Sequence, residues 1–326
     1  MSDEPRIPYP IIWRRLVEGK VVPFLGAGAS LVGRTPDSVW KGRETQFPPK
    51  GAELARYLAQ VVQYPSEDKH KIEDLARVAS YYVELNGQYR MGLLEELREC
   101  LGHAYEFGRL HALLAALPGH HLFVVTNYDV MLEQAFKAAQ KPYDLVVYPT
   151  ATDRPDLAAA VLWWPHGAAA ANAVAPDQLV IDLTTTTVIF KMHGTLPADS
   201  PPDGDTCVIT EEDYAEFLAR MTQSQAIPTI FHRHFHARSF LFLGYSLRDW
   251  NLRVLLHNLR LPTAPTDDPA AGAARRRPPD SWAIQYMPSA FEREVWRSRG
   301  VRIFHEDLDR FAGELERERD SDVPRG

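Results

Sequence analysis

The amino-acid sequence predicts an α/β protein with a Rossmann-like parallel sheet, helices on both faces of that sheet and a helical insertion. Short apolar runs, typical of buried strands, alternate with segments of helical periodicity along most of the chain. The first run, residues 20–25, leads directly into a glycine turn, Gly26-Ala27-Gly28-Ala29-Ser30. Polar residues come directly after several later runs, at the strand ends where parallel sheets bind ligands.

The pattern of apolar residues places the individual elements. Strands are expected at residues 20–25, 122–125, 145–148, 188–192, 239–243, 282–286 and 301–304. Helices are expected at residues 11–19, 130–139, 249–259, 289–298 and 307–318. Residues 51–117 have a helical pattern without a strand-like run, which predicts a helical layer or subdomain.

We expect these elements to form a single domain over residues 1–326. Residues 150–187 are rich in Ala, Pro and small polar residues, and they predict an irregular insertion. Residues 261–280 are rich in Pro, Ala, Asp and Arg, and they predict a flexible loop.

Composition excludes several classes of protein. The net charge of −7 argues against nucleic-acid binding through a basic surface. Two cysteines, Cys100 and Cys207, can form neither a disulfide framework nor a thiolate zinc site, so no metal is expected. The N-terminus has no signal-peptide pattern, and no apolar run approaches the roughly 20 residues of a membrane helix. We therefore expect a cytoplasmic protein without a membrane partner.

The glycine turn after the first strand suits a phosphate-binding site. Glycines let the backbone approach a ligand closely, and a following helix points its positive end at the same place. The dehydrogenase fingerprint is not met, because its third glycine falls at Leu31. No Gly-x-x-x-x-Gly-Lys-Ser/Thr sequence is present, which disfavours a P-loop enzyme. An ordinary strand-to-helix turn is the alternative reading of this segment.

Two further strand ends carry polar side chains. Asn127 and Asp129 follow the strand expected at 122–125, where they can either cap the next helix or hold ribose hydroxyls. His193 follows another apolar run and precedes Gly194. A neutral imidazole in that place can accept a proton, and a structural histidine is the alternative.

Other histidines and acidic residues have simpler explanations. His166-Gly167 lies in the small-residue segment and ranks below His193 as a site candidate. His232 and His236 would share a helix face as two metal ligands can, but no third ligand is evident, so a polar helix is preferred. Thr210 with Asp213 predicts a helix N-cap.

Taken together, the motifs resemble the Sir2-like family. The glycine turn, Asn127 with Asp129, His193-Gly194 and Gly244-Tyr245-Ser246 occur in the order of that family, and the resemblance spans about residues 12–310. It extends to residues 208–214 and to Asp249-Trp250-Asn251. The resemblance implies a Sir2-like or DHS-like NAD-binding fold.

The sequence is more similar to bacterial Sir2-like NAD-consuming effectors of anti-phage defence than to protein-deacylating sirtuins. Sirtuins carry a four-cysteine zinc ribbon, and this chain has too few cysteines to build one. Sirtuins also continue the glycine turn with Pro-Asp-Phe-Arg, whereas Pro36-Asp37 is followed here by Ser38-Val39.

The resemblance also implies roles for individual residues. Asn127 would orient the nicotinamide ribose and the attacking water, Asp129 would support the ribose or the nicotinamide pocket, and His193 would be the general base. The pyrophosphate would rest on the turn formed by Gly26, Ala27, Gly28, Ala29 and Ser30. The remaining expected NAD+-binding residues are Thr126, Gly194, Gly244, Tyr245, Ser246 and Asp249. Of these, Gly244 and Ser246 would lie against the adenosine half, and Asp249 would tie their loop to the next helix.

These roles predict an NAD+ hydrolase that forms nicotinamide and ADP-ribose and depletes cellular NAD+. An NAD-dependent protein deacylase and a non-catalytic NAD- or ADP-ribose-binding module are the alternatives. Cyclisation and base exchange are not distinguished from hydrolysis. We expect control by homo-oligomerisation, by a separately encoded sensor or regulatory protein, or by both.

Overall fold

The computed structural model describes residues 6–35, 37–42, 44–65, 69–85, 90–102, 105–196, 206–223, 225–245 and 281–322. Among these residues, a nine-stranded sheet has the strand order β11-β10-β9-β1-β2-β6-β3-β4-β5. Its strands are β1 (Val21–Leu25), β2 (Leu122–Val125), β3 (Asp144–Val147), β4 (Val161–Trp164), β5 (Asn172–Val174), β6 (Val188–Lys191), β9 (Ser239–Leu243), β10 (Ser281–Gln285) and β11 (Val301–His305). The neighbours from β11 to β3 are parallel, which confirms the predicted Rossmann-like fold.

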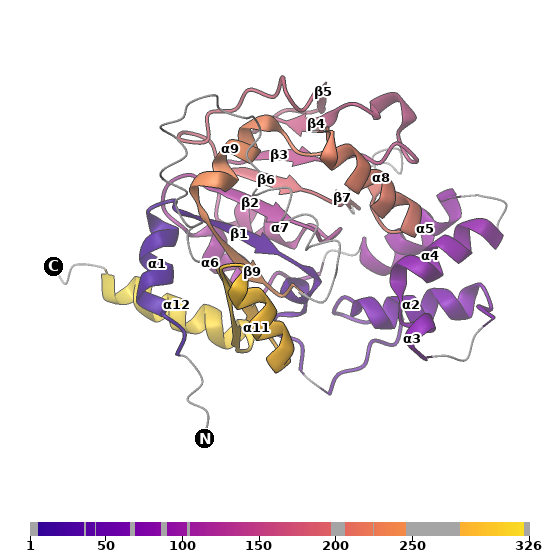
Figure 1. Cartoon of the computed structure of the whole chain (residues 1–326), viewed down its shortest axis with the longest axis horizontal. Coiled ribbons are helices and arrows are strands. Elements are labelled where there is room, and N and C mark those ends of the chain that lie inside the picture. Colours follow the sequence, from indigo (N-terminus) through magenta and orange to yellow (C-terminus); the bar gives the residue numbers. More distant parts are fainter. Residues whose placement is uncertain are drawn as a thin grey trace.

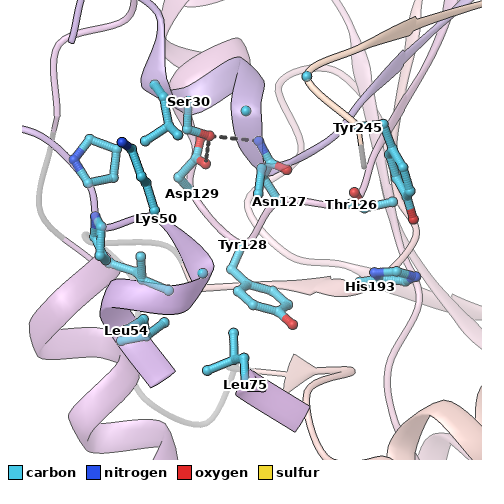
Figure 2. A pocket seen from close by; sticks show the side chains of 18 of the residues that line it. Ser30, Lys50, Leu54, Leu75, Thr126, Asn127, Tyr128, Asp129, His193 and Tyr245 are labelled. Atoms are coloured by element: carbon cyan, nitrogen blue, oxygen red, sulfur yellow. Dashed lines mark hydrogen bonds between the residues drawn. The ribbon is translucent and has the colours of Figure 1, made fainter. Parts of the chain in front are cut away.

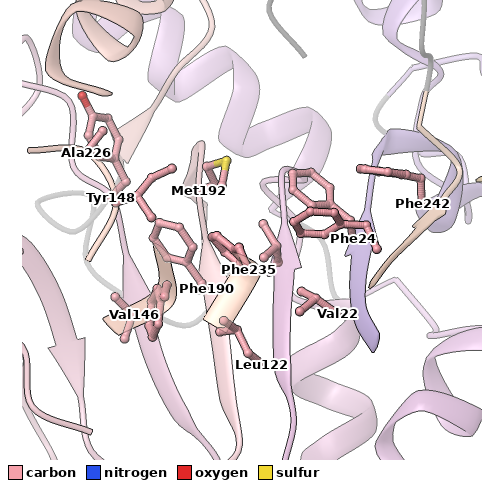
Figure 3. Packing of buried hydrophobic residues seen from close by; sticks show 14 of the residues in the cluster. Val22, Phe24, Leu122, Val146, Tyr148, Phe190, Met192, Ala226, Phe235 and Phe242 are labelled. Carbon is pink, nitrogen blue, oxygen red and sulfur yellow. The ribbon is translucent and has the colours of Figure 1, made fainter. Parts of the chain in front are cut away.

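Alternate residues of the strands face two different layers of helices. Val22 and Phe24 pack toward α8 (Glu211–Thr222), α9 (Thr229–Ala237) and α11 (Ala290–Ser298). Val21 and Leu25 pack toward the opposite layer of α1 (Tyr9–Val17), α6 (Arg109–Ala115), α7 (Met131–Ala138) and α12 (Leu308–Asp322). Figure 3 shows part of the first interface, where Phe24 lies beside Phe242 and Phe190 lies farther along the sheet. Burial of each such side chain contributes about 2 kcal/mol, so the central strands are well anchored.

The segment 150–187 is more regular than its composition predicts. It contributes β4 and β5, which extend the sheet antiparallel beyond β3, so the expectation of an irregular insertion was wrong for these residues. Trp163 Nε1 donates a hydrogen bond to Asp144 Oδ2 at 2.9 Å, which ties β4 to β3. The apolar run of β4 is only four residues long and lies among Ala and Pro residues, so the sequence pattern did not indicate a strand there.

A helical layer lies beside the carboxyl ends of the central strands (Figure 1). It contains α2 (Gly51–Val61), α3 (Lys69–Ile72), α4 (Leu75–Leu85) and α5 (Arg90–Leu101), which share a core of their own around Leu58, Val78 and Leu97. None of the described residues of 51–117 forms a strand, as predicted. However, α6 packs on the sheet, so the separate layer ends before that helix.

A buried cation fastens the helical layer to the rest of the protein. Arg90, at the start of α5, forms ion pairs with Asp153 and with Asp213, the latter at 2.9 Å. Its guanidinium also donates to the Cys207 carbonyl in the two-stranded sheet of β7 (Gly194–Thr195) and β8 (Thr206–Cys207). Asp213 also completes the predicted N-cap of α8 with Thr210, each accepting the other's backbone N–H.

The other predicted strands and helices agree with the structure to within a few residues where the structure describes them. Each predicted strand is present, and four of the predicted helices correspond to α1, α7, α11 and α12. The predicted helix 249–259 and the predicted loop 261–280 lie outside the described residues. No helix in the described part of the chain has the length and apolar character of a bilayer crossing.

Candidate active site

The glycine turn after β1 packs directly against the turn after β9. Gly26 N–H donates to the Leu243 carbonyl at 3.0 Å, and Gly28 N–H donates to the Gly244 carbonyl at 2.8 Å. A Cβ on Gly28 would lie 2.7 Å from that carbonyl oxygen, and a Cβ on Gly244 (φ +65°) would collide with Ala29 N. Glycine is therefore required in both turns because two backbones meet there.

In this packing, several backbone N–H groups of the predicted phosphate-binding turn donate to protein carbonyls instead. The N–H groups of Gly26 and Gly28 donate to the β9 turn, and Ala29 N–H donates to the Gly26 carbonyl at 2.8 Å. The turn thus forms the floor of a site, while three of its donors already have protein partners.

A chain of hydrogen bonds connects the glycine turn to the end of β2. Ser30 Oγ donates to Asp129 Oδ2 at 2.5 Å, and Asn127 Nδ2 donates to Ser30 Oγ at 2.6 Å (Figure 2). Asp129 Oδ1 accepts the Met131 N–H at 3.0 Å, so this carboxylate also caps α7. Asp129 therefore positions Ser30 and the start of α7, and its carboxylate also lines the cavity described below.

The same chain fixes which way the Asn127 amide points. Ser30 has one hydroxyl proton and gives it to a carboxylate, which can only accept, so Ser30 must accept from the Asn127 nitrogen. The Asn127 carbonyl oxygen is consequently turned away from Ser30. It is buried and has no hydrogen-bond partner among the described residues. A buried acceptor left without a partner indicates a place for a ligand donor.

His193 lies across the cavity from Ser30, beyond Asn127 (Figure 2). Its ring packs edge-on against Tyr214 and Phe217, with ring centres 5.6 and 5.4 Å away. Burial among these rings lowers the pKa of His193 from 6.5 to about 4, because the charged imidazolium would lose its hydration. The ring is therefore neutral at pH 7 and able to accept a proton.

Neighbouring residues hold these two strand ends in place. Gly194 has φ +85°, and a Cβ there would collide with the Thr206 carbonyl, so the β7–β8 pairing requires glycine after His193. Thr126 bonds the Leu25 carbonyl through both its N–H (3.0 Å) and its hydroxyl (3.2 Å), which joins the ends of β1 and β2. Thr126 thus serves the framework of the site and also lines it.

A buried ion pair contacts the loop that follows β2. Lys191 Nζ lies 3.3 Å from Glu133 Oε1 on α7, and it also donates to the Asp129 backbone carbonyl. Lys191 is fully buried, and burial raises the pKa of Glu133. The pair contributes to the position of the loop that carries Asn127.

The predicted site residues converge on a cavity of about 400 Å³, a size suited to a small-molecule site. Its lining includes Ala27, Gly28, Ser30, Thr126, Asn127, Asp129, His193, Gly244 and Tyr245. Gly26, Ala29 and Gly194 shape the adjoining turns and do not line it. Ser246 and Asp249 lie outside the described residues.

Sequence reasoning missed one wall of this cavity. The helical layer contributes Lys50, Leu54 and Leu75, and α8 contributes Tyr214. Lys50, Leu54 and Leu75 belong to no motif at a strand end, and the packing of the helical layer brings them to the site. Tyr214 lies in the segment 208–214 of the family resemblance, which gave it no role in the site.

A second cavity of about 680 Å³ continues the first along the carboxyl edge of the sheet. The two share the residues Gly28, Leu31, Lys50, Gly244 and Tyr245. The second cavity extends to the ends of β10 and β11, where Gln285 and Glu306 line it. Such a two-part cleft with the glycine turns at its centre has the layout that an extended dinucleotide needs.

The other histidine candidates stay outside this site. His166 lines a separate surface cavity, and its backbone N–H donates to Asp144 Oδ1 at 2.9 Å. His232 is buried in α9, the helix predicted from its sequence. The described residues contain no group of three His, Cys, Asp or Glu side chains that could hold a metal ion.

Sequence comparison relates the chain to proteins named NAD(+) hydrolase ThsA. The relative from Enterococcus faecium is 26% identical over 245 residues, which cover 71% of this chain and 42% of the relative. The relative from Acinetobacter baumannii (strain 532279) is 27% identical over 264 residues, which cover 80% of this chain and 43% of the relative. The relative from Bacillus cereus (strain MSX-D12) is 25% identical over 208 residues, which cover 63% of this chain and 36% of the relative. The chain thus spans less than half the length of these relatives.

A family model described as SIR2-like domain matches residues 121–304. The matched segment is more than half of the chain and contains both Asn127 and His193, which line the same cavity. With the parallel sheet and the paired glycine turns, this match shows that the chain belongs to the SIR2-like family.

Proposed function

We propose that this chain hydrolyses NAD+ to nicotinamide and ADP-ribose. The observation that carries the proposal is that one cavity beside the glycine turns is lined by both Asn127, whose oxygen has no partner among the described residues, and the neutral His193 ring. The name NAD(+) hydrolase of the relatives supports the same substrate. The nicotinamide half would occupy the cavity with His193, and the adenosine half would occupy the cavity that reaches β10 and β11.

The reaction breaks the bond between ribose C1′ and the nicotinamide nitrogen. Nicotinamide leaves as a neutral molecule and keeps the electron pair of that bond, so no acid is needed at the leaving group. Positive charge develops on the ribose, and a water oxygen forms the new bond to C1′. The protein must therefore hold the ribose, position one water and take one proton.

Asn127 and His193 suit these tasks. The Asn127 oxygen can accept a hydrogen bond from a ribose hydroxyl or from the attacking water. The neutral His193 ring can accept the proton that the water loses and later release it to solvent. Ser30 and Asp129 keep the amide of Asn127 turned toward the substrate.

Two alternatives have less support. A deacylase of the sirtuin type would need a zinc ribbon, and two cysteines cannot supply its four thiolates. A non-catalytic NAD-binding module would need no buried proton acceptor such as His193 at the nicotinamide end.

We propose further that the reaction depletes cellular NAD+ in anti-phage defence, and that oligomerisation or a separately encoded sensor controls it.

The test is product analysis of the purified chain incubated with NAD+, alone and with the products of neighbouring genes. We expect nicotinamide and linear ADP-ribose in equal amounts, and we expect Asn127→Ala and His193→Ala to abolish their release. Arg297→Ala, a change on the exposed face of α11, is the control for handling and purity. Unchanged turnover in both site variants would refute the assigned site, and a cyclic product would refute hydrolysis.

A further inference from the structure

The diphosphate of NAD+ needs positive charge that the glycine turns do not supply by themselves. Three N–H groups of the turn after β1 already donate to backbone carbonyls. The cavities instead contain acidic groups, with Asp129 in the first and Glu306 and Asp307 in the second. A cation from elsewhere in the chain would therefore stabilise an anionic ligand in this cleft.

Lys50 is placed to be that cation. It belongs to the few residues that line both cavities, together with the paired turn residues Gly28 and Gly244. Figure 2 shows its side chain rising from the start of α2 on the side of the cavity where Ser30 and Asp129 lie. The Lys50 backbone N–H donates to Glu53 Oε2 at 2.7 Å, which fixes the start of α2 while the ammonium stays exposed.

The other basic side chains at the cleft are already neutralised. Arg34 lines the second cavity, but it is 2% exposed and forms an ion pair with Glu53 at 2.6 Å. Lys191 lines neither cavity, and its ammonium is paired with Glu133. Among the described residues that line either cavity, Lys50 is the one lysine or arginine without a carboxylate partner.

On the basis of the proposed function, we propose that Lys50 binds the diphosphate of NAD+. The ammonium closes over the phosphates from the helical layer while the two glycine turns support them from the sheet. The positive N-terminal end of α2, whose first residues also line the first cavity, adds to the attraction. Substrate binding is thereby coupled to the position of the helical layer.

The experiment compares Lys50→Met with Lys50→Arg, which keeps the charge, and with Lys41→Met. Lys41 is an exposed lysine of the same loop that lines neither cavity. We measure the Kd of ADP-ribose and of nicotinamide riboside, which has no phosphate, by calorimetry at several salt concentrations. The KM and kcat for NAD+ are measured in parallel, and melting curves confirm folding.

We expect Lys50→Met to weaken ADP-ribose binding about tenfold or more and to raise the KM for NAD+ similarly, with kcat little changed. The salt dependence of ADP-ribose binding should become less steep, because one charge contact is lost. The Kd of nicotinamide riboside should not change in Lys50→Met. In Lys50→Arg and Lys41→Met, the Kd of ADP-ribose and the KM for NAD+ should stay within about threefold of the values for the parent protein.

Equal ADP-ribose affinity in Lys50→Met and the parent protein would overturn the proposal, as would an equal loss for nicotinamide riboside. Such a result, with nicotinamide still released from NAD+, would leave the proposed hydrolysis standing. Conversely, Lys50-dependent binding of ADP-ribose without turnover would refute the hydrolysis and retain the role of Lys50. If the folded parent protein binds neither compound, both proposals fail.

Discussion

Asn127 donates its side-chain N–H to Ser30 Oγ at 2.6 Å, and this contact turns the opposite end of the amide toward the candidate site. The two residues are 97 positions apart in the sequence and meet because β1 and β2 are adjacent parallel strands. Ser30 in turn is held by Asp129. The orientation of a group proposed to touch substrate therefore depends on two residues that do not need to touch it.

Ser30→Ala tests this dependence. Without the hydroxyl, the Asn127 amide loses the partner that distinguishes its two ends, and part of the population presents an N–H where the acceptor is needed. We expect kcat to fall about tenfold or more while folding is retained. The measurement is nicotinamide release, with Ser321→Ala on exposed α12 as the matched control. An unchanged kcat would show that the Ser30 contact does not orient Asn127.

The pH dependence of kcat/KM tests the role of His193. Burial lowers the pKa of His193 in the folded protein to about 4, below its ordinary value of 6.5. The ring therefore stays neutral as the pH falls from 7 to about 5, and activity should persist over that range. Activity should decline only as the pH approaches about 4. An acid limb centred near 6.5 would contradict the buried proton acceptor.

The same pKa difference affects stability in a defined direction. Between about pH 6.5 and 4, the unfolded chain binds a proton at His193 that the folded chain does not, so the free energy of unfolding decreases as the pH falls. Circular dichroism at each pH separates unfolding from loss of activity. His193→Asn removes this ring and should make the unfolding free energy less dependent on pH in that window.

In the buried pair of Lys191 and Glu133, removing one charge is expected to destabilise the protein more than removing both charges. Glu133→Leu alone leaves a buried ammonium unpaired and should destabilise the protein by about 3–5 kcal/mol. The double variant Lys191→Met/Glu133→Leu removes both charges and should recover much of that loss in urea unfolding. It also removes the donor to the Asp129 carbonyl, so nicotinamide release should remain reduced after stability recovers. Full activity in the double variant would contradict a role in holding the loop.

Gly244→Ala tests the contact between the two glycine turns. The residue has φ +65°, and a Cβ would run into the turn of Gly28 and Ala29. Gly119→Ala is a matched control, because Gly119 has φ +78° and open space around the Cβ position. The control should show only the backbone penalty of about 1 kcal/mol in urea unfolding. Gly244→Ala should be more destabilising and should also lower NAD+ affinity. Equal effects of the two changes would show that the turns can separate without consequence.

Most of the sheet could be predicted from local sequence. The strand around Phe24 and the strand ending at Val125 are continuous apolar runs because both of their faces are buried under helices. The segment containing β4 was missed because a four-residue strand between Ala- and Pro-rich turns has no periodicity long enough to detect. That strand forms through its pairing with β3, which is a contact the local pattern does not contain.

The candidate site was predicted unevenly for the same reason. Asn127 and His193 could be selected because each follows a buried strand, and parallel strand ends share one edge of the sheet. Lys50 could not be selected, since it follows no strand and precedes an ordinary amphipathic helix. The contacts of Asp129 with Ser30 and with the start of α7 could not be predicted either, because they join residues that only the fold brings together.

By itself, the sequence determined which segments become buried strands and which polar residues stand at their ends. These properties follow from continuous apolar runs, from the polar residues that end them and from glycine at the turns. The tertiary structure alone decided which end of the Asn127 amide faces the cavity, that His193 is neutral, and that Lys50 reaches the same cleft. Those three properties depend on contacts between residues far apart in the chain, and hydrogen-bond direction and desolvation exist only once those residues are packed together.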